Sequence, residues 1–128
     1  MPTRHPHEAA ARLAGELYGR ILNRNADRDG YDYVLDSLRE GKKSVRQHAL
    51  EMIASAEFTN QFVNGGGPQS AARVLNKVLL GRDLGEPLLK FEAEKYVRIG
   101  RERYAEQLTQ SEEYRRLCGE DRVPWHGH

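Results

Sequence analysis

Oxygen-bearing side chains recur at calcium-ligand spacing between residues 25 and 36. Asn25, Asp27 and Asp29 take positions 1, 3 and 5 of a twelve-residue loop, with Gly30 at position 6 and Asp36 at position 12. Oxygen ligands in this order form the cage of an EF-hand. The end positions depart from that pattern, which prefers Asp at the first and a bidentate Glu at the last. We therefore favour a turn in which an Asp caps the next helix, with a calcium-binding helical domain as an alternative.

Two histidine pairs lie near the ends of the chain, His5 with His7 and His126 with His128. Four imidazoles brought together by neighbouring termini are a chemically reasonable zinc site. Both pairs fall in segments without predicted structure, and no Cys or Asp accompanies them at ligand spacing. We therefore predict no metal site and no cofactor.

The remaining reactive candidates have structural interpretations. Cys118, the single cysteine, has no acid–base partner nearby in the sequence, so we predict a position in the core and a reducing, cytoplasmic setting. Gly65, Gly66 and Gly67 lack the Lys-Ser/Thr pair of a phosphate-binding loop and are predicted to form a hinge. No nucleophile–base pair is evident, and we expect a protein that is not an enzyme.

Apolar residues recur at helical spacing along nearly the whole chain, and no segment alternates with period two. The sequence therefore predicts an all-α domain, a compact bundle of about seven or eight helices. The expected helices run from 8 to 22, from Asp27 or Asp29 to Gly41, from a Ser44–Gln47 capping box through residue 53, from Ser55 through Phe62, up to Gly81, from Pro87 to Gly100, through 104–108, and from Ser111 to Gly119.

Similar motifs occur twice. Ser55-Ala56-Glu57-Phe58 is followed 56 residues later by Ser111-Glu112-Glu113-Tyr114, and an apolar helix ends in Asn23-Arg24 and again in Gly81-Arg82. We predict two diverged copies of one helical unit, residues 9–64 and 68–119, within a single domain of residues 9–125. Residues 1–8 are predicted to be a flexible N-terminus and 120–128 an extended tail. A helical unit built twice favours a scaffold over a catalytic cleft.

The order of these motifs resembles the phycobilisome linker polypeptide domain. That family has a Leu-Gly-Arg turn, as at residues 80–82, an Asp/Ser-x-Glu-Tyr motif, as at 111–114, and a Phe-Gly-x-Asp-x-Val-Pro-Tyr ending, similar to 118–125. Segments 38–46 and 55–62 look like the family's first half. The positions that carry the resemblance are Ser55, Phe58, Phe62, Gly81, Arg82, Ser111, Glu113, Tyr114, Gly119, Val123 and Pro124.

The resemblance implies a helical domain inside phycobiliprotein discs, which it joins into rods or to a core while tuning nearby bilin chromophores. It implies binding rather than catalysis, and a thylakoid-associated phycobilisome as the location if the organism is photosynthetic. The chain departs from the family in its near-neutral charge and in having Cys118 in place of Phe. The alternative is a protein-interaction module of the same fold in a non-photosynthetic bacterial assembly.

Composition narrows the range of partners. The chain has 20 basic and 19 acidic residues, with no run of more than two adjacent basic residues, which does not predict nucleic-acid binding. No apolar stretch is long enough to span a membrane. Arg and Tyr often anchor protein interfaces. A second copy of the chain is one of the candidate partners. The residues predicted to contact a partner are Tyr31, Tyr33, Arg46, Arg98, Arg101, Tyr104 and Trp125.

Overall fold

The computed structural model describes residues 2–63 and 66–124 of the 128-residue chain. Within these ranges the chain forms eight α-helices, two π-helical segments and no strand, which confirms the predicted all-α fold. The first half contains α1 (His7–Leu17), a π-helical segment (Tyr18–Leu22), α2 (Arg28–Glu40), α3 (Val45–Ala54), α4 (Ala56–Phe58) and a second π-helical segment (Thr59–Val63). The second half contains α5 (Gly67–Leu80), α6 (Leu88–Ile99), α7 (Arg101–Gln110) and α8 (Glu112–Leu117).

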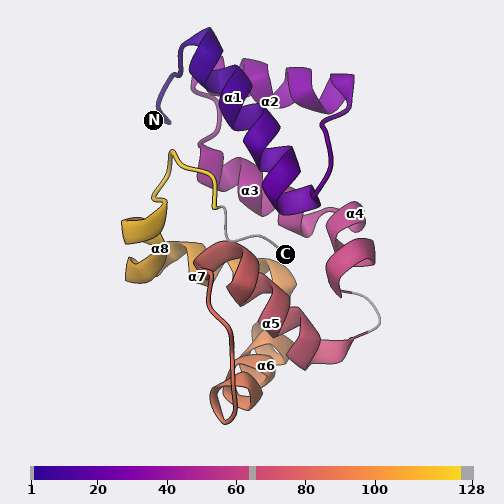
Figure 1. Cartoon of the computed structure of the whole chain (residues 1–128). Coiled ribbons are helices and arrows are strands. Elements are labelled where there is room, and N and C mark those ends of the chain that lie inside the picture. The colour runs from indigo at the N-terminus through magenta and orange to yellow at the C-terminus, as the bar shows by residue number, and fades with distance from the viewer. Residues whose placement is uncertain (1, 64–65, 125–128) are drawn as a thin grey trace.

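The helices form two lobes (Figure 1). α1 to α4 make up the first lobe at one end of the molecule, and α5 to α8 make up the second lobe at the other. α1 packs against α2, α5 packs against α6, and α3 packs against α7 across the boundary between the lobes. Buried apolar side chains, among them Leu38 and Phe58 in the first lobe and Leu79 and Tyr114 in the second, belong to one cluster. One hydrophobic core thus spans both lobes.

Polar side chains cap the helices where the sequence predicts. The Asp27 carboxylate accepts a hydrogen bond from a backbone N–H at the start of α2, at 3.1 Å. Ser44 and Gln47 form the capping box of α3. The Ser55 and Ser111 hydroxyls each accept from the backbone N–H three residues later, at 3.2 and 3.1 Å. These bonds satisfy N–H groups that have no partner inside the helix, so the helix starts are set locally.

An Arg–Glu contact joins the two repeated motifs in each lobe. Arg24 Nε and Nη2 donate to the Glu57 carboxylate at 2.6 and 2.9 Å, and Arg82 Nη1 lies 3.7 Å from Glu113 Oε1. The residue before each Arg has a left-handed backbone, with φ of 56° in the first lobe and 65° in the second. This turn ends the helix and directs the Arg away from its axis. The duplication of the unit stays a prediction.

The other positions that carry the family resemblance are structural. Phe58 and Tyr114 are fully buried, Phe62 packs partly buried against the core, and Val123 is 4% exposed. Gly119 has a φ of 63°, a left-handed conformation that favours glycine after a helix end. The described parts of these motifs therefore hold the fold together.

A buried polar network connects the helices of the second lobe. Asn76 of α5 is 0% exposed, and its Nδ2 donates to the Ala72 carbonyl and to the Tyr104 hydroxyl, both at 2.8 Å. Its Oδ1 accepts from Arg82 Nε and Nη2 at 3.1 and 2.5 Å. The Tyr104 hydroxyl donates to Glu92 Oε1 at 2.6 Å. α5, α6 and α7 are thus tied together, and Arg82 extends the network toward α8.

Two arginines cross the boundary between the lobes in opposite directions. Arg46 of α3 donates to Thr109 Oγ1 of α7 at 3.2 Å and pairs with Glu120 after α8. Arg101 at the start of α7 donates to the carbonyl of Ala54, the last residue of α3, at 3.3 Å. The structure therefore corrects the prediction that Arg46 and Arg101 bind a partner. Both guanidinium groups contact the opposite lobe of the same chain.

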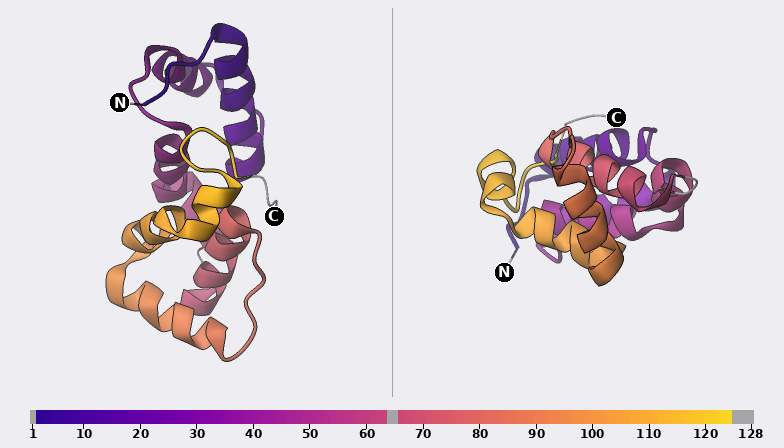
Figure 2. Two further views of the ribbon diagram at one scale, coloured as in Figure 1. Left: turned by 90° about the vertical axis from the view of Figure 1, so that its left-hand side faces the viewer. Right: turned by 90° about the horizontal axis from the view of Figure 1, so that it is seen from below.

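The two ends of the described chain meet, since the segment after α8 turns back toward the first lobe (Figure 2). Thr3 Oγ1 donates to Asp121 Oδ2 at 3.1 Å, and the His5 backbone N–H donates to the Leu38 carbonyl at 2.9 Å. α1 begins at His7, and the chain after α8 is buried again at residues 123–124. Residues 2–8, predicted to be a flexible N-terminus, and 120–124, predicted to be the start of a tail, thus both pack onto the domain.

Replacing Tyr104 by Phe is expected to lower the free energy of unfolding by about 1–3 kcal/mol, because buried Glu92 loses its hydrogen-bond donor. Tyr33→Phe removes the same atom from a side chain that is 50% exposed, and its effect is expected to stay below about 0.5 kcal/mol. Urea unfolding followed by circular dichroism measures both variants. Equal losses would contradict a structural role for the Tyr104 hydroxyl.

Candidate functional site

α6 has one face in the core and another that leaves large apolar side chains in solvent. Leu89 and Ala93 are 3% and 6% exposed, whereas Phe91 and Val97 are 61% and 64% exposed. Phe91 and Val97 are the most exposed large hydrophobic residues in the described part of the chain. Exposed apolar side chains gathered on one element are typical of a protein-binding site. We define the outward face of α6 as Lys90, Phe91, Glu94, Val97 and Arg98.

Basic side chains accompany these apolar ones. Lys90 and Arg98 are exposed, Lys95 is half-buried, and none of the three forms an ion pair or a side-chain hydrogen bond with another residue in ranges 2–63 and 66–124. Glu94 is the acidic residue among them. Their charge is therefore free to interact with a partner, and it is positive in sum.

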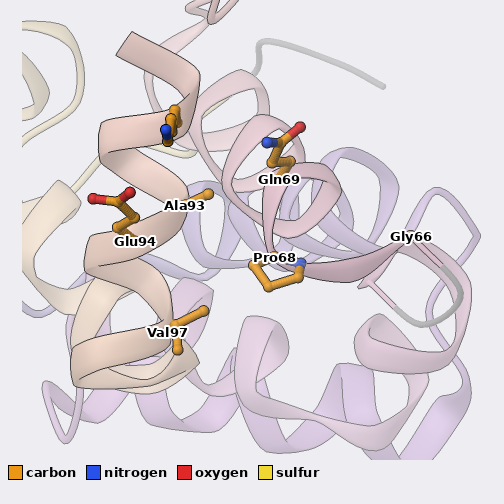
Figure 3. Close-up of a pocket in the computed structure, with 7 residues that line it drawn as sticks. Gly66, Pro68, Gln69, Ala93, Glu94 and Val97 are labelled. Carbon is orange, nitrogen blue, oxygen red and sulfur yellow. The ribbon is translucent and has the colours of Figure 1, made fainter. Parts of the chain in front are cut away.

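A groove with a volume of 610 Å³ lies between α6 and the N-terminal turn of α5 (Figure 3). Ala93 and Val97 extend from α6 toward α5, with Pro68 across from them, so the floor is apolar (Figure 3). Lys90 and Gln69 supply polar groups to the lining. The groove can receive apolar side chains of a partner, and its lining residues provide no nucleophile paired with a base.

The residues predicted to contact a partner are dispersed over the structure. Arg98 lies on the outward face of α6, and Tyr33 is half exposed while its hydroxyl bonds to neighbouring charged side chains. Tyr31 packs partly buried against the core. The prediction for Tyr104 is wrong, because this residue is 0% exposed inside the Asn76 network. Trp125 lies outside the described residues.

Phe91 and Val97 are not among the residues that the sequence predicts to contact a partner. Leu89, Ala93 and Tyr96 follow one another at i, i+4 and i+7, and they form the buried or half-buried stripe of α6. Phe91 falls outside that spacing, whereas Val97 lies four residues after Ala93 and continues it. The off-stripe position of Phe91 is a signal in the sequence, whereas the exposure of Val97 follows from the packing of α6 alone.

A Ser–His–Glu chain lies in the first lobe. His48 Nε2 is 2.8 Å from Ser37 Oγ, and His48 Nδ1 is 3.3 Å from Glu51 Oε1. With Nδ1–H directed at the carboxylate, the Ser37 hydroxyl donates to Nε2. This order matches a nucleophile, a base and an acid, but Ser37 is only 3% exposed within α2. A substrate cannot reach the hydroxyl, so the cluster holds α2 against α3.

The calcium-like pattern does not form an EF-hand loop. α2 begins at Arg28, so residues 28–36 are helical, and the Asp27 carboxylate is used as the cap of α2. Among the described residues, no three or more His, Cys, Asp or Glu side chains are grouped to hold a metal ion. His126 and His128 of the zinc hypothesis lie outside the described part of the chain.

Two further sequence predictions concern Cys118 and the glycine run. Cys118 is buried, as predicted, and burial raises the pKa of its thiol, which keeps it protonated and unreactive. α5 begins at Gly67 and Gly66 is its N-cap residue, so helix extends into the predicted hinge, whose residue Gly65 lies outside the described ranges.

Comparison with known families gives a match in the first half of the chain. Residues 9–62 are similar to a family described as "Domain of unknown function (DUF4214)". This segment corresponds to the first lobe and lies within the first predicted unit, residues 9–64. No curated protein matches the chain. In the described part of the chain, every helix is too short or too polar to cross a bilayer.

Burial lowers the pKa of His48 below its ordinary value of 6.5, Lys43 acts in the same direction, and Glu51 opposes them. The folded protein therefore keeps His48 neutral at a pH where the unfolded chain already binds a proton. The unfolded state binds more protons as the pH falls below about 6.5, so acidification lowers the free energy of unfolding. The free energy of unfolding stops falling for this reason once the pH is below the pKa of His48 in the folded protein.

We expect His48→Gln, whose amide does not titrate, to reduce this pH dependence between pH 7.5 and 5. The difference in slope is at most about 1.4 kcal/mol per pH unit, the limit for one proton. His7→Gln removes an exposed imidazole at the start of α1 and serves as the control. Chemical denaturation across the pH range measures all three proteins. A slope unchanged by His48→Gln would contradict the assignment.

Proposed function

We propose that this chain is a non-enzymatic linker or scaffold domain that binds other proteins through the outward face of α6. The observation that carries the proposal is the exposure of Phe91 and Val97, at 61% and 64%, beside cations without an internal partner. Burying these two side chains against a partner removes apolar surface from water. Aromatic and Arg side chains at the centre of a contact are also the groups that contribute most to protein binding.

Phycobiliprotein discs are the first partner that we propose. The support is the order of motifs that resembles phycobilisome linkers, from the Leu-Gly-Arg turn to the Val-Pro ending. Such a domain would lie in the cytoplasm, on the thylakoid-associated phycobilisome. Discs are acidic in that family, and the exposed cations of α6 are of the complementary sign.

A protein-interaction module of the same fold in a non-photosynthetic bacterial assembly is the second candidate. The observation that favours it is the formal charge of only +1, which departs from the basic character of the linker family. Both candidates use a protein-binding surface and differ in the partner. The presence or absence of phycobiliproteins in the source organism separates them.

The disc proposal predicts that the chain at micromolar concentration migrates with purified phycobiliprotein discs in size-exclusion chromatography at low salt. Replacing both Phe91 and Val97 by Ser is expected to weaken this binding about tenfold or more, because two central apolar contacts are lost. The melting temperature should stay nearly unchanged, since both side chains are exposed in the free protein.

Leu117→Ser is the matched control, because it removes an exposed apolar side chain (39%) from α8. It should bind discs like the unmodified chain. Absence of binding by the unmodified chain would reject discs as the partner. Equal weakening by the Leu117 variant and the α6 variant would reject the outward face of α6 as the contact.

A further inference from the structure

We infer that the groove between α5 and α6 binds an amphipathic helix of acidic character from the partner protein. This inference rests on the proposed linker function and adds the chemistry of the bound element. The groove is lined by Gly66, Pro68 and Gln69 of the α5 end and by Lys90, Ala93, Glu94 and Val97 of α6 (Figure 3).

The shape of the groove fits a helix. α6 lines the groove from Lys90 to Val97, so this side extends for about 10 Å, or roughly two helical turns. Its floor of Ala93, Val97 and Pro68 is apolar (Figure 3). A helix in such a groove inserts apolar side chains at i, i+4 and i+7 and keeps its polar face in solvent.

Charge selects an acidic helix. Lys90 lines the groove and Arg98 directly follows the lining residue Val97, and both are exposed and have no ion pair in the described chain. Glu94 is the single exposed acid of α6. Other basic residues are paired: Arg24 and Lys43, for example, contact glutamates. A basic partner helix would meet like charge, whereas Asp or Glu beside the apolar anchors would pair with Lys90 and Arg98.

A second copy of the chain fits less well. Two α6 helices packed antiparallel about Glu94 bring Phe91 against Val97, but they also bring Lys90 against Arg98 and Glu94 against its counterpart. Like charges placed in contact in this way oppose pairing. An anionic membrane also fits less well, because the apolar residues line a concave groove, whereas a membrane-bound helix presents a convex apolar face.

The inference is tested with two fluorescein-labelled helical peptides of 15 residues, one with Leu at positions 1, 5, 8 and 12 and Glu beside them, the other with Lys in place of each Glu. Fluorescence anisotropy at low salt should show that the full chain binds the acidic peptide at least about tenfold more tightly than the basic one. Raising the salt concentration should weaken this binding, since the rim charges are exposed.

Reversing the charge of two cations on α6 tests whether they set the preference between the peptides. Lys90→Glu combined with Arg98→Glu should reverse the preference between the peptides, by about tenfold or more in each direction. Arg115→Glu combined with Arg116→Glu makes the same change in net charge on α8, where both residues are exposed, and should leave the preference unchanged. Melting temperatures of both variants show whether each is folded.

Three results would overturn the inference. The first is no difference between the peptides, or the same response in both double variants. The second is binding to vesicles of anionic lipid that depends on Lys90 and Arg98 while the acidic peptide is not bound. The third is a dimer in sedimentation that dissociates on Lys90 and Arg98 replacement. Discs that bind without the acidic peptide binding would reject only the groove inference. Peptide binding without disc binding would reject only the disc proposal.

Discussion

The side-chain amide of Asn76 lies at 0% exposure, and both of its N–H donors and both lone pairs of its oxygen are used. Tyr104 carries this network to Glu92 of α6, and Arg82 carries it toward α8. A buried polar group that loses its partner costs about 1–3 kcal/mol. The helices that supply these partners are therefore held in one arrangement, and the second lobe depends on it.

This network also decides which side of α6 meets solvent. Glu92 points inward to the Tyr104 hydroxyl, and Leu89 and Ala93 lie beside it in the core. The helical period then leaves Phe91 on the other side and Val97 at the edge beside Ala93, where the described chain does not cover them. The proposed binding surface is thus the consequence of a buried anchor, and an alteration of that anchor would act on binding from within the lobe.

The first lobe meets similar requirements with different residues. His48 stands 56 residues before Tyr104 and connects α3 to α2 through Ser37, as Tyr104 connects α7 to α6 through Glu92. Each lobe also has an Arg–Glu contact between its repeated motifs. The family match to residues 9–62 covers the lobe that contains His48. These correspondences are what a diverged duplication predicts, with a neutral imidazole in one copy and a phenol in the other.

The sequence by itself determined the helices, their caps at Asp27, Ser44, Ser55 and Ser111, and the buried place of Cys118. Caps are readable because a side chain bonds a backbone group three residues away, within one turn. Only the tertiary structure decided that Tyr104 is buried, that Arg46 and Arg101 join the lobes, and that Val97 is exposed. Their partners lie far away along the chain, 63 residues for Arg46 with Thr109 and 47 for Arg101 with Ala54. Packing between helices brings such residues together, and local periodicity contains no information about which helices will meet.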